Sequence, residues 1–166
     1  PRENVSWYEA IAFCRWLSWK LGGGFDLDAV NQWAVRLPTA HEWEKAARGT
    51  DGRLYPYGNQ FDPNRGNTEE SGIRGTTPVT RYINGASPYG VMDMSGNVWD
   101  WCLTSYEQSV IDPKTEDLHT NMYRVVRGGV WDRGEYSASA VNHGGRPPVG
   151  QYPSRGFRLV TTHPTG

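Results

Sequence analysis

The chain has 166 residues, the size of one domain, and its 17 basic and 18 acidic residues give a net charge of -1. A near-neutral chain without blocks of like charge does not support electrostatic capture of nucleic acid or of an anionic membrane, so we expect neither partner. No apolar run approaches the roughly 20 residues that cross a bilayer, and the N-terminus lacks the layout of a signal peptide.

Aromatic side chains are expected to build the core. Hydrophobic residues make up only 37% of the chain, but eight tryptophans, nine tyrosines and four phenylalanines supply a large buried area per side chain. The content of 20 glycines and 11 prolines is higher than a helical bundle tolerates, and it indicates many turns and long shaped loops. Two cysteines, Cys14 and Cys102, are too few for a disulfide-dense secreted scaffold or a four-thiolate zinc site.

Two capping boxes predict two helices. The first box, at 6–9, is followed by apolar residues at helical spacing until a run of three glycines, which predicts a helix over 6–21. The second box, at 39–42, leads into Trp43 and a pair of alanines and predicts a shorter helix over 40–48.

The rest of the chain is expected to hold loops and short strands. Residues 49–88 have the composition of a loop, with an extended piece at 78–82. So long a loop is expected only where a bound ion or a binding surface organises it. Strands are predicted at 98–103, 123–127 and 157–160, which form a small antiparallel sheet packed against the helices in an α+β fold.

Several sequence motifs occur in an order that marks one family. They are Asn4-Val5-Ser6-Trp7, Arg36-Leu37-Pro38-Thr39, Glu42-Trp43-Glu44, Ala46-Ala47-Arg48-Gly49, Tyr55-Pro56-Tyr57-Gly58-Asn59, Asp93-Met94-Ser95-Gly96-Asn97-Val98-Trp99-Asp100-Trp101, Arg124-Val125-Val126-Arg127-Gly128-Gly129 and Gly156-Phe157-Arg158-Leu159. Over residues 4–160 the chain resembles the formylglycine-generating-enzyme (sulfatase-modifying factor) domain family. The resemblance implies a single domain over 1–166 with a C-type lectin-like fold of two helices, short antiparallel strands and many irregular loops. The family's usual N-terminal portion is not matched, so we expect an upstream segment to be missing.

The resembled family includes oxidases, iron-dependent sulfoxide synthases and non-catalytic binders, so the site residues must decide. The oxidase uses a copper-binding cysteine pair after Arg-Gly-Gly, but 130–155 contains no cysteine. The sulfoxide synthases need iron-ligating histidines, and the histidines of this chain are not spaced as a metal pair: His41, His119, His143 and His163. The alternative to a binding domain remains an oxidoreductase with catalytic groups from an upstream segment, or an inactive relative of one.

A calcium site is one interpretation of the Gly-Asn-x-Trp motif. Asp93 and Asp100 bracket a turn, and with the carbonyls of Gly96 and Val98 they offer oxygen ligands for one hard cation. The resembled enzymes hold a calcium here, and Asn67 matches the position of their second calcium. The alternative is that Asp93 caps the turn and Asp100 is a solvated or hydrogen-bonded carboxylate. Any such calcium would be structural, and no cofactor is required for catalysis.

The segment 130–155 is the predicted ligand-binding region. It has no helical or strand period, and it combines Tyr and Trp with Arg, Asp, His and Ser on a glycine-rich backbone, as binding surfaces do. An irregular surface loop is the alternative. The expected contact residues are Val130, Trp131, Asp132, Arg133, Gly134, Tyr136, Val141, Asn142, His143, Arg146, Val149, Gln151, Tyr152, Ser154 and Arg155.

The chain also resembles the variable proteins of diversity-generating retroelements. These proteins use the same lectin-like domain and end shortly after a Gly-Phe-Arg motif. Their sequences vary in the segment after Arg-Gly-Gly, because adenines, often in asparagine codons, are rewritten and the encoded residue changes. The resemblance implies a non-catalytic domain that binds a protein or other macromolecular ligand through a diversified surface. An undiversified binder of the same fold is the alternative. The compartment stays open, with a prokaryotic or phage origin and the cytoplasm favoured.

Overall fold

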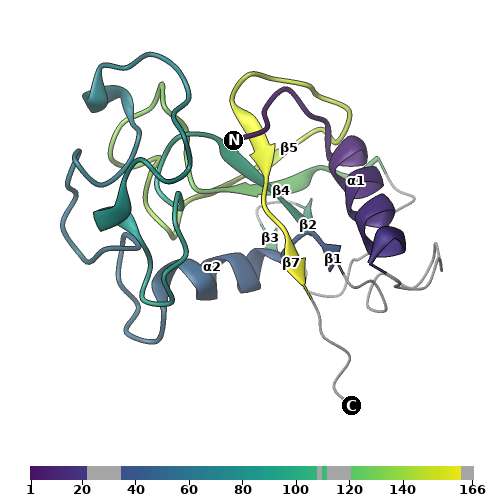
Figure 1. Cartoon of the computed structure of the whole chain (residues 1–166), viewed down its shortest axis with the longest axis horizontal. Helices are drawn as coiled ribbons and strands as arrows, with labels where there is room; N and C mark the ends of the chain where they lie inside the picture. Colours follow the sequence, from purple (N-terminus) through teal and green to yellow (C-terminus); the bar gives the residue numbers. More distant parts are fainter. Residues whose placement is uncertain (22–34, 108–109, 112–120, 162–166) are drawn as a thin grey trace.

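The computed structural model of the chain describes residues 1–21, 35–107, 110–111 and 121–161 (Figure 1). Within these residues the strands are β1 (Val35–Arg36), β2 (Trp99–Glu107), β3 (Val110–Ile111), β4 (Arg124–Arg127), β5 (His143–Arg146), β6 (Arg155–Phe157) and β7 (Val160–Thr161). Two short 3-10 helices, η2 (Glu69–Ser71) and η3 (Ile83–Gly85), interrupt the long loop between α2 and β2. No helix of the described part of the chain is long and apolar enough to cross a membrane.

Both α-helices lie where the capping boxes predict them. Helix α1 (Trp7–Lys20) begins after Ser6, and helix α2 (Ala40–Arg48) begins after Thr39. In each case the N-cap hydroxyl accepts a hydrogen bond from the backbone N–H three residues later, and a glutamate side chain returns the bond. Gly49 caps the C-terminus of helix α2. Its φ of 66° is a backbone conformation that glycine adopts without strain, because it has no Cβ.

The main sheet is mixed. Its strands run in the order β3-β2-β4-β5, and β6 also pairs with β2. The β2–β6 pair is parallel, with Trp99 opposite Arg155, whereas the prediction was of antiparallel strands throughout. Strand β5 runs in the same direction as β2, because both are antiparallel to β4. The connection from β5 to β6 crosses to the other side of β2, and β6 keeps this direction, so it pairs with β2 in parallel. A second sheet consists of β1 and β7.

The strand predictions are confirmed in part. The predicted strand at 98–103 corresponds to β2, that at 123–127 to β4, and that at 157–160 overlaps the ends of β6 and β7. The prediction of an extended piece at 78–82 is wrong. It is a turn in which the Arg81 N–H donates to the Pro78 carbonyl at 2.9 Å, because proline supplies the acceptor without needing a strand partner.

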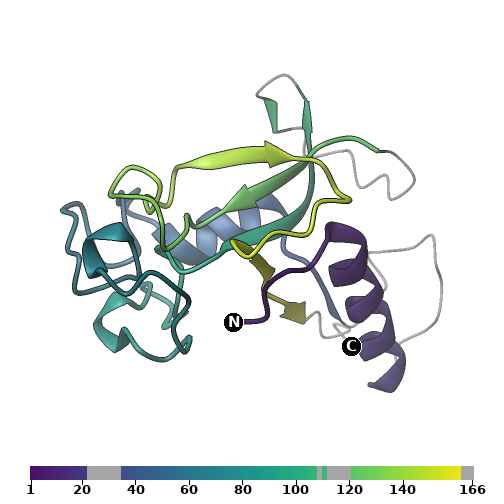
Figure 2. The same cartoon turned by 90° about the horizontal axis from the view of Figure 1, so that it is seen from above.

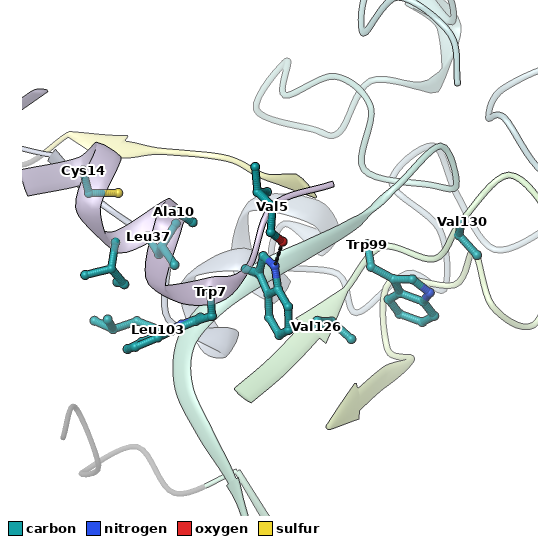
Figure 3. Close-up of a cluster of buried hydrophobic side chains, with 11 residues drawn as sticks. Val5, Trp7, Ala10, Cys14, Leu37, Trp99, Leu103, Val126 and Val130 are labelled. Carbon is teal, nitrogen blue, oxygen red and sulfur yellow. Dashed lines mark hydrogen bonds between the residues drawn. The ribbon is translucent and has the colours of Figure 1, made fainter. Parts of the chain in front are cut away.

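Two apolar clusters pack on opposite faces of the main sheet. The first joins α1 to β2 through Trp7, Trp101 and Leu103, and Figure 3 shows its labelled members. The second joins α2 to the sheet through Trp43 and Cys102. Alternate side chains of β2 therefore serve alternate clusters, as the pleat of a strand dictates.

The core is built from tryptophans, as the composition predicts. Trp7, Trp43 and Trp101 are almost completely buried. Each indole N–H has a hydrogen-bond acceptor: the Trp7 Nε1 donates to the Cys102 carbonyl at 2.9 Å, and the Trp101 Nε1 donates to the Val5 carbonyl at 3.0 Å. The Trp43 Nε1 donates to a carboxylate oxygen at 2.8 Å. These bonds remove the cost of burying a polar indole atom.

Candidate ligand-binding surface

The segment 130–155 contains a strand flanked by two loops (Figure 2). The first loop (131–142) precedes β5 and the second loop (147–154) follows it, so the loops leave opposite ends of the strand. Strand β5 was not predicted, because its sequence, His-Gly-Gly-Arg, has no apolar alternation. A glycine is needed at 145 because the ring of Tyr106 would lie 2.0 Å from a Cβ there.

The first and last residues of β5, His143 and Arg146, lie on opposite faces of the sheet. The ring of His143 lies 6.1 Å from that of Tyr106, which packs against the second cluster. The Nη1 of Arg146 lies near Gly144, on the face where Val126 packs into the first cluster. The expected contact residues therefore do not form one continuous face, because side chains of a strand alternate in direction.

The first loop begins inside the core. Val130 is only 2% exposed and belongs to the first cluster, and Trp131 packs against that cluster. Both were predicted as ligand contacts, but Val130 is buried in the scaffold and Trp131 is half-buried against it. The next residues are exposed: Asp132, Arg133 and Tyr136, with 80% of Tyr136 accessible.

The remaining contact residues of the first loop are less accessible. Gly134 and Asn142 are half-buried, and the Asn142 Nδ2 donates to the Ser137 carbonyl at 3.4 Å. Val141 is exposed at the end of the loop.

The backbone of the first loop is held by hydrogen bonds to distant segments. The Glu69 N–H donates to the Arg133 carbonyl at 3.2 Å, and the Ala140 N–H donates to the Leu54 carbonyl at 2.8 Å. The Ser95 hydroxyl donates to the Ala138 carbonyl at 3.0 Å. The loop is thus irregular but fixed, because its polar backbone groups have partners.

An acidic patch borders the first loop. It consists of Glu69, Glu70, Asp132 and Glu135, all exposed, and the Glu135 N–H donates to the Glu70 Oε1 at 3.3 Å. Glu69 and Glu70 were not predicted as site residues, because nothing in a loop more than 60 residues away indicates that it packs beside Gly134. The carboxylates give this end of the surface a negative charge.

The second loop packs against the start of α1. The Trp7 N–H donates to the Pro148 carbonyl at 2.9 Å, and the Trp99 N–H donates to the Ser154 carbonyl at 2.8 Å. The Gln151 Nε2 donates to the Glu9 Oε1 at 2.7 Å. This anchoring leaves Val149 68% exposed at the tip of the loop.

Tyr152 and Arg155 form a stack at the end of the second loop. The guanidinium carbon of Arg155 lies 3.8 Å from the centroid of the Tyr152 ring and 5.4 Å from that of Trp101. Tyr152 is 46% exposed, whereas Arg155 is 7% exposed. Of the predicted contact residues in this loop, Val149, Gln151 and Tyr152 are therefore exposed, Ser154 is half-buried and Arg155 is buried.

The aspartates of the predicted calcium site are engaged with protein groups. Asp100 is buried, and its Oδ2 accepts hydrogen bonds from the Trp43 indole and the Arg158 guanidinium. Both carboxylate oxygens of Asp93 accept from the Asn97 Nδ2, at 3.1 and 2.9 Å. Because Arg158 already supplies the positive charge beside Asp100, these residues do not fit a calcium ion, and the hydrogen-bonded alternative is favoured.

The other predicted calcium ligands have structural roles. The Asn67 Nδ2 donates to the Gly75 carbonyl at 2.8 Å and to the Asn97 Oδ1 at 3.1 Å. The Gly96 N–H donates to the Gly128 carbonyl at 2.7 Å, and Val98 is buried. Within the described ranges no group of three or more His, Cys, Asp or Glu is arranged to hold a metal ion. Two buried asparagines organise the long loop where an ion or a binding surface was expected.

The two cysteines do not form a thiol pair. Cys14 lies in the first cluster and Cys102 in the second, and both are free and buried. Burial raises the pKa of the Cys14 thiol to about 12 and also raises the pKa of Cys102. Neither is poised as the thiolate that copper binding or nucleophilic attack requires. His119 and His163 lie outside the described residues, and His41 lies on α2 away from His143 on β5.

The fold and these motifs define a member of a known family. Residues 1–163 match the model of the Sulfatase-modifying factor enzyme 1-like domain, and the chain therefore belongs to this family. The inactive C-alpha-formylglycine-generating enzyme 2 of Mus musculus is 33% identical over 98% of this chain and 49% of its own length. The formylglycine-generating enzyme of Thermomonospora curvata is 34% identical over 78% of this chain and 44% of its own length.

The fold of this chain is also similar to that of a solved structure. Treponema denticola variable protein 1 superimposes with a TM-score of 0.77 and 26% identity, over 96% of this chain and 70% of that chain. This similarity confirms the expected α+β, C-type lectin-like fold and the resemblance to variable proteins. The chain spans about half the length of the curated relatives it matches.

Proposed function

We propose that this domain is a non-catalytic ligand-binding module of the variable-protein kind. One observation carries the proposal: within 130–155 the backbone is hydrogen-bonded to the scaffold, whereas selected side chains are exposed. The exposed contact residues are Asp132, Arg133, Tyr136, Val141, Val149, Gln151 and Tyr152. A fixed backbone bearing exposed aromatic and charged side chains allows those side chains to change without refolding, which a diversified protein-binding surface requires.

A paired library tests this proposal. One library randomises five exposed positions on a display platform: Asp132, Arg133, Tyr136, Val149 and Tyr152. The matched library randomises five buried positions: Val125, Val126, Val130, Ala138 and Ala140. Most members of the first library should resist protease, whereas most of the second should not, because core positions tolerate few side chains.

The same exposed-position library also tests binding. Selection against immobilised lysozyme as a test protein should yield binders whose affinity depends on the randomised positions. A library that unfolds as readily as the buried one, or that yields no binder, would contradict the proposal. Separately, a near-copy of the codons for 124–160 that differs only at adenines, beside a reverse transcriptase gene, would support natural diversification. Without such a copy an undiversified binder of this fold would remain.

The alternative function is an oxidoreductase, for which the similarity to the Thermomonospora curvata enzyme is the supporting observation. The two thiols of this chain are buried in separate clusters, so catalysis would need groups from outside the described residues. Copper titration together with turnover of a cysteine-containing peptide separates the two functions. Stoichiometric copper binding with peptide oxidation would overturn the non-catalytic proposal.

A further inference from the structure

Two arginines that flank the second loop have no acidic partner among the described residues. Arg146 ends β5 and Arg155 begins β6, and neither lies within salt-bridge distance of a carboxylate in the described part of the chain. Arg127, which is also buried, pairs with Glu44 at 2.8 Å. Burying a guanidinium without a counter-charge costs free energy, so the contrast between Arg127 and Arg155 needs an explanation.

The guanidinium of Arg155 is incompletely satisfied. Its Nη1 is buried and has no hydrogen-bond partner. The stack on Tyr152 and Trp101 offsets part of the desolvation cost through cation–π attraction, but ring faces leave the in-plane N–H groups without acceptors. An acceptor oxygen at Nη1 would remove the remaining cost.

A tight turn that follows Arg146 places Gly150 against Arg155. Directly after Arg146 the chain turns, and the Gly150 N–H donates to the Pro147 carbonyl at 3.3 Å. A Cβ at Gly150 would lie 2.9 Å from the Arg155 Nη1 and 2.4 Å from the Tyr152 ring. Burial, and next the positive charge of Arg146, lower the pKa of Arg155, so the two cations repel each other at this site. An anion placed between them would relieve that repulsion.

We propose that Arg146 and Arg155 form a binding site for the carboxylate of an acidic side chain on the partner, beside the Tyr152 ring that stacks on Arg155. This inference rests on the proposed function, because it specifies the chemistry of the ligand that the second loop would bind. The planar guanidinium fork suits the two oxygens of a carboxylate. Inorganic phosphate shares the chemistry of an oxyanion, so the experiment must separate the two sources.

The test uses the full chain with isotope-labelled arginine side chains, observed by NMR at constant ionic strength. The probes are a blocked tetraglutamate peptide, the matching tetraglutamine peptide and inorganic phosphate. Tetraglutamate should shift the side-chain signals of Arg146 and Arg155 saturably, and tetraglutamine should not. Arg146→Ala should weaken tetraglutamate binding about tenfold, because one of two charge-assisted contacts is lost. The matched control Arg81→Ala, at an exposed arginine in the turn before η3 and outside the segment 130–155, should leave it unchanged.

Arg155→Lys provides a second variant that keeps the charge but removes the fork, and it should also weaken binding. If this variant does not fold, Arg146→Ala still decides the result. Absence of a saturable shift, equal effects of Arg81→Ala and Arg146→Ala, or saturation by phosphate alone would each overturn the proposal. Binders from the exposed-position library together with a failed titration would reject only the carboxylate site. A positive titration without any binder would reject only the proposed function.

Discussion

At the residue scale, neighbouring positions in the first loop have opposite roles. Val130 and Trp131 pack into the first cluster, whereas Asp132, Arg133 and Tyr136 are exposed. The sequence presents all five in one run of mixed composition, and their burial separates them. Substitutions at these positions should therefore divide into those that change stability and those that change only binding.

Tyr136→Ala and Trp131→Ala test this division. Tyr136→Ala should change the free energy of unfolding by less than about 0.5 kcal/mol, because an exposed side chain loses few contacts on truncation. Trp131→Ala should lower it by about 2 kcal/mol or more, because a cavity opens against the first cluster. Urea unfolding of both variants measures the difference. Equal losses would show that Tyr136 is packed in solution.

Asp93 should make stability depend on pH. Burial raises its pKa from 3.8 to about 6, against the opposing hydrogen bond from Asn97. Because the pKa is higher in the folded than in the unfolded chain, the contribution of the protonated carboxyl is complete below about pH 4 and is lost as the pH rises through about 6. Asp93→Asn should remove this loss, which amounts to about 3 kcal/mol. Denaturant titrations of both proteins from pH 4 to 7 check the sign. Parallel pH profiles would contradict it.

At the element scale, the long loop before β2 is held by a pair of buried asparagines. The Asn97 Oδ1 accepts from the Thr77 N–H at 2.9 Å and from the Asn67 Nδ2, and its Nδ2 donates to the Thr77 carbonyl at 3.1 Å. The Asn97 N–H donates to the Asn67 carbonyl at 2.7 Å. These amides provide the partners that helix or sheet would give elsewhere.

Asn97→Gly should destabilise the protein by about 3 kcal/mol, because several buried polar groups lose their partners together. Glycine is the suitable replacement, since Asn97 has a φ of 67° and glycine introduces no backbone strain there. Asn84→Gly, at an exposed position in η3, is the matched control and should have little effect. Thermal unfolding measured by circular dichroism distinguishes them, and similar melting temperatures would contradict the role of the Asn67–Asn97 pair.

The ion pair of Asp100 with Arg158 predicts that calcium has no effect on stability. The melting temperature should be the same in millimolar calcium chloride and in a chelator at equal ionic strength, because the carboxylate already has a cationic partner. Asp100→Asn should lower the melting temperature equally in both solutions. A rise with calcium that is absent in Asp100→Asn would restore the metal site.

At the scale of the whole molecule, one sheet carries both cores. Val126 of β4 packs into the first cluster with α1, and its neighbour Val125 packs into the second cluster with α2. The two clusters share the backbone of β2 and β4, so neither can lose its packing without disturbing the hydrogen bonds that support the other.

We therefore expect a single cooperative unfolding transition. Val125→Ala and Val126→Ala remove the same atoms from opposite faces, and each should lower the midpoint while the tryptophan fluorescence and far-ultraviolet transitions remain coincident. Two separated transitions in either variant would contradict the prediction of a single domain.

Local features were predictable from the sequence alone. The helices α1 and α2 start at Ser6 and Thr39 as predicted, because a capping box is completed within four residues of chain. The family motifs were sufficient for the fold class, and the tryptophan-rich composition was sufficient for the character of the core. Strand β2 was predictable because its sequence has enough β-branched and aromatic residues.

Only the tertiary structure decided the rest. It places Val130 in the core, divides the binding region at β5, and turns β6 parallel to β2. It also places Gly150, in the turn that follows Arg146, against the Arg155 guanidinium. These features depend on which distant segments meet when the chain crosses the sheet, and a glycine-rich segment without periodicity carries no local signal of that crossing. The sequence by itself thus determined the family, the helices and the composition of the surface, while long-range packing determined which of its side chains face solvent.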